Sequence, residues 1–209
     1  MTKKLLSLST TAIAAAIALA GCGTGGGSGS SSTSMPGMDH GGSSSSAPST
    51  SAPAAATDHN AADVTFAQMM IPHHAQAVEM SDMILMKQDV PAEVTDLATK
   101  IKAAQGPEIE TMTGWLKSWN EPTMPSGHSM EGMEGMVGEE DMKKLEAAQG
   151  TEAAKLFLSQ MVAHHEGAVT MAKTEGTAGK NADAVSLSKA IVTAQEAEIQ
   201  EMQKLLGTL

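Results

Sequence analysis

Two short segments of the chain place histidine and methionine side chains together at helical spacing. The predicted ligands are Met70, His73, His74 and Met80 in the first segment and Met161, His164, His165 and Met171 in the second. At about 100° per residue, His73 and His164 each fall at the centre of a stripe that also carries methionines and a small alanine. The second histidine of each pair falls at the edge of its stripe. Each segment, if helical, therefore directs one imidazole and at least two thioethers to an interior.

Imidazole and thioether groups are neutral, soft to borderline ligands. They suit Cu(I), and silver by extension, better than Mg²⁺ or Ca²⁺, which prefer oxygen, and imidazole also serves Cu(II). The alternative is an ordinary core stripe, because methionine is a common core filler. The same spacing around a histidine pair occurs twice, and this favours copper, with Cu(I) preferred.

A different candidate site lies between the two segments. Its ligands are His128, Met130, Met133 and Met136, in a Gly- and Met-rich stretch at about residues 122–138. Such a stretch can wrap a Cu(I) ion without a preformed cage, and we expect it to be a mobile capture segment. Met35, Met38 and His40 form a shorter version nearer the N-terminus. The alternative is a linker that happens to contain methionine.

An internal repeat supplies the elements that position these groups. Residues 66–80 match residues 157–171 at an offset of 91, and residues 101–116 match 191–206 at an offset of 90. Two matches at nearly one offset indicate a duplication. Four helices are expected, at about 65–87, 92–119, 152–175 and 181–207, with a short surface helix at 139–148. Four such helices with short connections predict an all-α antiparallel four-helix bundle formed by two helix pairs.

Local signals predict where these helices begin. Thr65 and Gln68 can form a capping box, Thr151 can cap the third helix and Asn181 the fourth. Pro72 lies inside the first predicted helix, and Pro107 lies inside the second, so each helix is expected to start late or to kink there. The second repeat has alanine at both equivalent positions, so the fold does not need the prolines.

The second helix of each pair carries a Gln-x-x-Glu-Ile motif, with Glu108 in one copy and Glu198 in the other. These carboxylates could accept a hydrogen bond from the second imidazole nitrogen and so orient the metal ligand. The alternative is that each pairs with a lysine at the helix edge.

The N-terminal part of the chain predicts export. Lys3 and Lys4 precede an apolar run, and residues 1–21 read as a signal sequence. Its end, Leu19-Ala20-Gly21-Cys22, is similar to a bacterial lipobox, which predicts a lipid on Cys22 and attachment to the outer face of the cell membrane. An ordinary secretory signal is the alternative. Residues 22–57 are poor in large apolar side chains and predict an unfolded tether. The folded domain is then 58–209, with repeats at about 63–120 and 151–207.

Composition narrows the range of functions. Cys22 is the only cysteine, so the domain has no thiolate ligand and no disulfide. The chain has 13 basic and 24 acidic residues and no arginine, which argues against nucleic acid and against phosphate or carboxylate substrates. The 17 methionines contrast with 2 phenylalanines, 2 tryptophans and no tyrosine. Their repeated association with histidine makes core filling an insufficient account.

The paired Met-x-x-His-His-x-x-Ala-Val-x-Met segments, at Met70 and Met161, resemble the domain-of-unknown-function family 305 (DUF305) over about residues 60–207. The resemblance implies a ferritin-like four-helix fold. It also implies copper handling in the periplasm or outside the cell. A di-iron oxidase is not expected, because no histidine has a glutamate three positions before it.

The expected function is therefore copper buffering, sequestration or transfer by a protein that is not an enzyme. Its partners would be the metal ion, the membrane through the lipid anchor, and a second copy of the chain or a copper-transfer protein. Two alternatives stay open. One is a metal-dependent redox enzyme, such as an oxidase of cuprous ion. The other is a structural or partner-binding bundle whose methionine stripe is only core.

Overall fold

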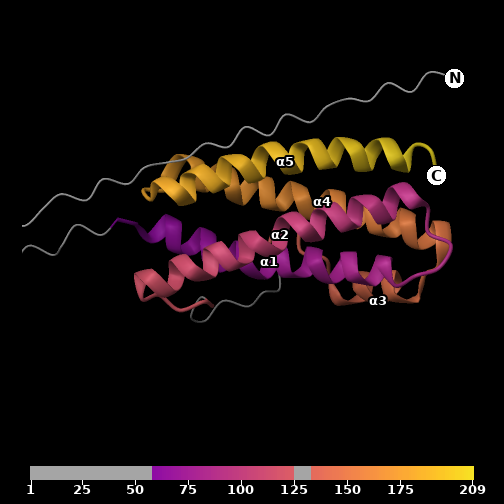
Figure 1. The fold of residues 1–209 in the computed structure, drawn as a ribbon, viewed down its shortest axis with the longest axis horizontal. Helices are drawn as coiled ribbons and strands as arrows, with labels where there is room; N and C mark the ends of the chain where they lie inside the picture. The colour runs from indigo at the N-terminus through magenta and orange to yellow at the C-terminus, as the bar shows by residue number, and fades with distance from the viewer. Residues whose placement is uncertain (1–57, 125–132) are drawn as a thin grey trace, which may run out of the picture. The chain divides into compact units, whose positions relative to one another are not determined.

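Helices account for nearly all of the chain that the structure, a computed structural model, describes, namely residues 58–124 and 133–209. Five helices and no strands occur in these ranges: α1 (Ala61–Leu85), α2 (Ala92–Trp119), α3 (Glu139–Ala147), α4 (Gly150–Ala178) and α5 (Ala182–Leu206) (Figure 1). The predicted signal sequence, Cys22, the tether, His128 and Met130 lie outside the described residues. None of the described helices is long and apolar enough to cross a membrane.

The start of α1 is set by a capping box one turn earlier than predicted. The Asn60 side chain accepts hydrogen bonds from the N–H groups of Ala62 and Asp63, and the Asp63 carboxylate accepts one from the N–H of Asn60 at 2.6 Å. The predicted box at Thr65 is therefore wrong, since the Thr65 hydroxyl donates to the carbonyl of Ala61 inside the helix. The helix also does not start late at Pro72, which lies well inside it.

The other helices begin close to the predicted positions. The second helix spans the predicted residues, follows Pro91 and ends at Asn120 in the left-handed region, with φ at 60°. Helix α4, which is the third of the four predicted long helices, begins at Gly150 without a side-chain cap. The predicted cap at Thr151 is therefore wrong. Asn181 caps α5 as predicted, through its side-chain oxygen and the N–H groups of the first turn.

The helices pack as two hairpins. One consists of α1 and α2 and the other of α4 and α5, while α1 against α4 forms the main contact between them and α2 touches α5 only slightly (Figure 1). The short α3 lies against α4 and α1 and buries Leu145. The prediction of an all-α bundle built from two helix pairs is confirmed.

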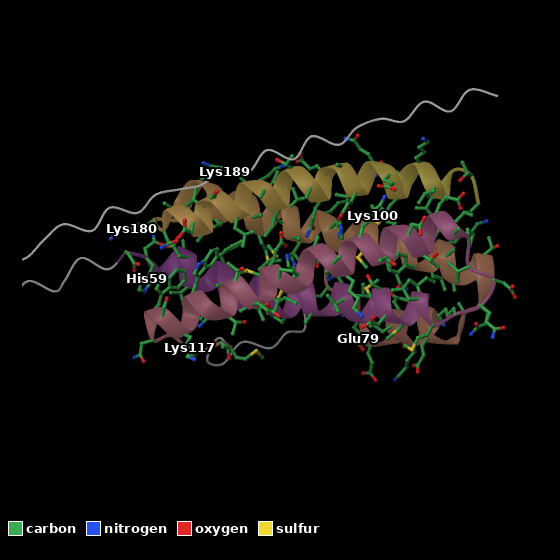
Figure 2. The ribbon with its side chains drawn as sticks, in the orientation of Figure 1. His59, Glu79, Lys100, Lys117, Lys180 and Lys189 are labelled. Carbon is green, nitrogen blue, oxygen red and sulfur yellow. The ribbon has the colours of Figure 1, made fainter. Side chains whose placement is uncertain are left out.

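Two separate apolar clusters fill the bundle. One gathers around Ile84, Leu97, Ile101, Phe157 and Leu158, and the other around Phe66, Met70, Met112, Leu116 and Ile191. Lysines and glutamates such as Glu79, Lys100 and Lys189 lie on the outside, where their charges are solvated (Figure 2). The division into two clusters leaves a gap in the apolar packing midway along the helices, and the four predicted histidine ligands of the repeats lie there.

Candidate metal centre

A layer of polar side chains separates the two apolar clusters, and every long helix contributes to it. Its members are His73 and His74 from α1, Gln105 and Glu108 from α2, His164 and His165 from α4, and Gln195 and Glu198 from α5. On α2, for example, Ile101 belongs to one cluster and Met112 to the other, so the residues between them fall at the layer. All four imidazoles are 0–1% exposed. Burying four imidazoles is costly unless their nitrogens find partners.

His73 and His164 form the centre of the layer. Their ring centroids are 3.8 Å apart, and the rings are tilted by 40°. Burial, reinforced by the neighbouring histidines, lowers the pKa of His73 to about 3 and the pKa of His164 to about 2. Both rings are therefore neutral at pH 7, the state in which imidazole can ligate a metal.

The outer histidines are held by carboxylates, with the hydrogen bonds predicted from sequence. His74 Nε2 lies 2.7 Å from a carboxylate oxygen of Glu108, and His165 Nε2 lies 2.7 Å from one of Glu198. A carboxylate can only accept, so Nε2 carries the hydrogen, and Nδ1 of a neutral ring keeps its lone pair. Both Nδ1 atoms are buried, and neither has a hydrogen-bond partner among residues 58–124 and 133–209. This is the arrangement in which an outer carboxylate orients a metal-binding histidine.

The central histidines are less fully satisfied. His73 Nε2 lies 3.3 Å from the carbonyl oxygen of Glu134, which fixes its hydrogen on Nε2, and its Nδ1 has no partner among the described residues. Neither ring nitrogen of His164 has a described partner with ordinary hydrogen-bond geometry. Unpaired buried polar groups of this kind are rare in proteins. His73 thus presents an Nδ1 lone pair, while the ring of His164 interacts with the backbone of His73.

The predicted thioethers fall into two groups. Met70 and Met161 are fully buried and lie one turn before His73 and His164, at the two borders of the layer. Met80 and Met171 lie seven residues beyond a central histidine, a rise of about 10 Å along the helix. Met80 and Met171 thus lie farther along their helices from the central imidazoles than Met70 and Met161 do, and their role as ligands stays a prediction.

The segment between the repeats also differs from expectation. Met133 is 9% exposed, Met136 is partly buried, and a hydrogen bond of 3.1 Å from the N–H of Met136 to the carbonyl of Met133 closes a turn. This turn packs on α1 and α4, and whether its methionines capture an ion stays a prediction.

The layer has a definite coordination preference. The described residues contain no group of three or more His, Cys, Asp or Glu side chains arranged to hold an ion. Two facing imidazoles with thioethers at the borders suit a soft monovalent ion of low coordination number.

Some parts of the layer had no assigned role in the sequence. Gln105 and Gln195 are 2% and 3% exposed, and their side chains have amide atoms without described partners. Both belong to the Gln-x-x-Glu-Ile motifs, so their periodicity with Glu108 and Glu198 was the signal. The carbonyl of Glu134 gave no signal, because any residue carries one.

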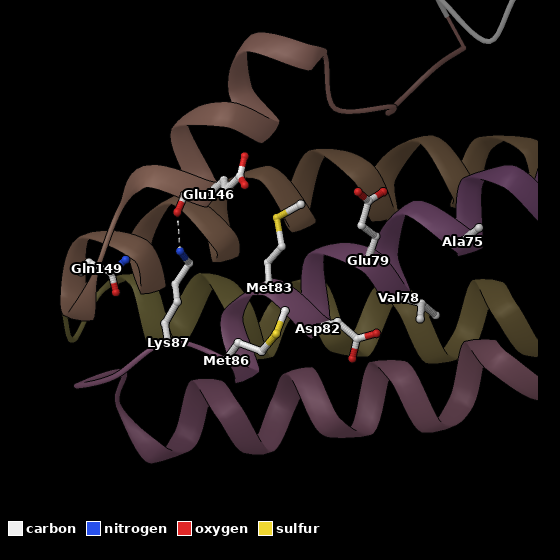
Figure 3. A pocket seen from close by; sticks show the side chains of 9 residues that line it. All are labelled: Ala75, Val78, Glu79, Asp82, Met83, Met86, Lys87, Glu146 and Gln149. Atoms are coloured by element: carbon white, nitrogen blue, oxygen red, sulfur yellow. Dashed lines mark hydrogen bonds between the residues drawn. The ribbon is translucent and has the colours of Figure 1, made fainter.

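An open pocket elsewhere on α1 is distinct from this layer. Its lining includes Glu79, Asp82, Met83 and Met86, and Lys87 donates to the carbonyl of Glu146 at its rim (Figure 3). None of its lining residues is a histidine. It is therefore not the site that the repeats predict.

Comparisons with known proteins agree with the helical fold. Residues 63–206 match the domain of unknown function DUF305. A DUF305 protein from Streptomyces coelicolor, described as a candidate secreted protein, is 37% identical with a TM-score of 0.67, covering 70% of this chain and 93% of its own. A DUF305 fragment from Deinococcus radiodurans is 30% identical with a TM-score of 0.66, covering 72% and 98%.

A third similar structure is CopM, solved in Cu(I)-bound, Cu(II)-bound, silver-bound and apo forms. Its Cu(I)-bound form is 29% identical with a TM-score of 0.59 and covers 70% of this chain and 96% of its own. No match to this sequence is found among curated proteins. By the match over residues 63–206 and the similarity of these structures, the chain belongs to the DUF305 family.

Proposed function

We propose that this protein binds copper in the polar layer and serves to buffer, sequester or pass on the ion. The observation that carries the proposal is the facing pair His73 and His164, neutral and buried, with Nδ1 of His73 left without a hydrogen-bond partner among the described residues. A bundle evolved only for packing gains nothing from four buried imidazoles. A metal ion accepts the lone pairs that the protein leaves unused.

Cu(I) is the favoured state. His73 and His164 supply two neutral ligands, and Met70 and Met161 offer thioethers within one turn of them. Soft, neutral nitrogen and sulfur ligands suit a soft monovalent ion such as Cu(I). They add no negative charge to the buried site. The Cu(I), Cu(II) and silver forms of CopM support a metal of this class.

We place this function outside the cytoplasm. The candidate secreted relative supports this location, and the signal-like residues 1–21 agree with it. A lipid on Cys22 would tether the domain to the outer face of the membrane. Copper arriving there meets a chain with an excess of 11 negative charges, which raises the local concentration of cations.

We propose binding rather than catalysis. The imidazoles are 0–1% exposed, so a bare ion can be enclosed among them while a larger substrate finds no contact surface. A redox enzyme in the same bundle would instead consume oxygen when supplied with Cu(I). Measurement of oxygen uptake under turnover conditions separates the two functions.

Titration of the full chain with Cu(I) under reducing conditions, in competition with a chromophoric chelator, tests the proposal. We expect tight binding by the wild type and loss of the tight site in the His73→Ala, His164→Ala double variant. Full retention of tight binding by the double variant would move the site elsewhere, and failure of the wild type to bind would refute the function. A Met80→Leu, Met171→Leu variant tests the two predicted thioethers separately: weaker binding would include them among the ligands, and unchanged binding would exclude them.

A further inference from the structure

The segment 133–137, here called the strap, lies across α1 and α4 beside the central histidines. On the α1 side, the Gln76 side chain donates to the carbonyl of Val137 at 2.9 Å and accepts from its N–H at 2.8 Å. Also on α1, His73 Nε2 lies 3.3 Å from the carbonyl of Glu134. Three hydrogen bonds therefore hold five residues of the strap to one helix.

On the α4 side, two glycines let the backbones touch. A Cβ at Gly167 would lie 2.3 Å from the carbonyl oxygen of Glu134, and a Cβ at Gly135 would lie 2.9 Å from the carbonyl oxygen of His164. Gly135 also has φ at +82°, a value that side chains disfavour. Both contacts are with backbone atoms, which cannot rotate away as a flexible side chain can. The strap thus requires glycine on both sides of this contact.

Gln76 and Gly167 occupy equivalent positions in the two repeats. Each follows the central histidine by three residues, at the repeat offset of 91. The two repeats differ at this position, and both residues contact the strap. Gln76 hydrogen-bonds to Val137 at the end of the strap, and Gly167 lets the backbone of Glu134 and Gly135 approach α4. The strap in turn hydrogen-bonds to the ring of His73, whereas the ring of His164 interacts with the His73 backbone and not with the strap.

We propose that Gln76 and Gly167 are positioning residues of the metal centre, which seat the strap so that the Glu134 carbonyl holds the His73 hydrogen on Nε2 and leaves Nδ1 for the ion. The carbonyl does for His73 what Glu108 and Glu198 do for the outer rings. The copper part of this inference rests on the proposed function, but the ring tautomer is a property of the metal-free chain.

The test replaces Gly167 by alanine in the full chain. Long-range proton–nitrogen NMR of ¹⁵N-histidine reads the tautomer of each ring in the metal-free protein. We expect a fixed Nε2–H form for His73 in the wild type and loss of that preference in Gly167→Ala, with His74 and His165 unchanged. Copper affinity, measured by chelator competition, should fall by about 10- to 100-fold, as for other groups that orient metal ligands.

Gly176→Ala is the matched control, because it adds the same methyl group to the same helix with only the Ser188 hydroxyl nearby, at 3.6 Å. Gln76→Leu removes the grip on Val137 without forcing a group into the contact, and it should reproduce the Gly167→Ala result. An unchanged His73 tautomer in both variants would overturn the proposal, even if copper binding itself failed. A lost tautomer preference with wild-type copper affinity would overturn the role in the metal centre.

Discussion

Replacing His164 by leucine should stabilise the metal-free protein. Its ring is 1% exposed, and neither nitrogen has a described partner of ordinary geometry. Each unpaired buried polar group costs about 1–3 kcal/mol, and leucine removes both. Imperfect fit of the new side chain offsets about 1–3 kcal/mol of that gain. Taking the middle of each range, about 4 kcal/mol gained and about 2 kcal/mol offset, a net gain of about 2 kcal/mol remains, which for a domain of this size raises Tm by roughly 4–8 °C.

The neighbouring His165→Leu is the matched control and should have the opposite sign. It removes the 2.7 Å hydrogen bond to Glu198 and leaves a carboxylate that is only 19% exposed without its donor. Loss of a hydrogen bond to a charged group costs about 1.5–3 kcal/mol. Thermal unfolding followed by circular dichroism, in the presence of a chelator that strips metal, measures both. The reasoning is refuted if His164→Leu lowers Tm as much as His165→Leu does, because the ring would then be a satisfied part of the core.

Three further predictions concern the layer and the end of the bundle. Glu198→Gln should weaken copper binding by about 10- to 100-fold in chelator competition, and Glu196→Gln, an exposed change on the same helix, should leave it unchanged. Because burial lowers the pKa values of His73 and His164 to about 3 and about 2, protons do not compete with copper at these rings between pH 8 and 5. The copper affinity should therefore stay nearly constant over this range. A tenfold loss of copper affinity per pH unit, starting near pH 6.5, would contradict this prediction. Burial and a neighbouring carboxylate raise the pKa of Glu175 to about 8, so the folded state holds a proton that the unfolded state releases above about pH 4.5. The free energy of unfolding should therefore fall as pH rises through this window, by up to about 1.4 kcal/mol per unit, and urea unfolding of Glu175→Gln should show the slope removed.

The elements and the composition of the layer could be predicted from sequence because both follow from periodicity. A helical stripe with histidine at its centre indicates which face of the helix is buried, and the repeat indicates that this face occurs twice. The same reasoning placed His74 and His165 at the edge of the stripe, yet both are buried because α2 and α5 cover that edge with Glu108 and Glu198. A helical wheel describes a single helix, so it does not show which neighbouring helix covers each face.

Other features depend on contacts between distant residues. Spacing along one helix leaves the roles of Met80 and Met171 open, because the same stripe carries both the histidines and the core residues that follow them. The start of α1 was missed because Asp63 serves two helices: it accepts from Asn60 in its own cap and from the N–H groups of Lys180 and Asn181 ahead of α5. The docking of residues 133–137 was also missed because it depends on a contact between distant residues. The sequence gives no sign that Gly167 must be glycine until the turn at Glu134 and Gly135 is seen beside it.

The central claim is that the facing imidazoles take up a soft ion through ring nitrogens that the protein leaves unpaired. A titration of the full chain with Ag(I) or Cu(I), with ¹⁵N-labelled histidine and ¹³C-methyl methionine, observes both classes of ligand together. We expect Nδ1 of His73 and a ring nitrogen of His164 to shift as one equivalent binds, with the hydrogen of His73 retained on Nε2. Binding that shifts methionine methyl groups while both central imidazoles stay unchanged would contradict the claim.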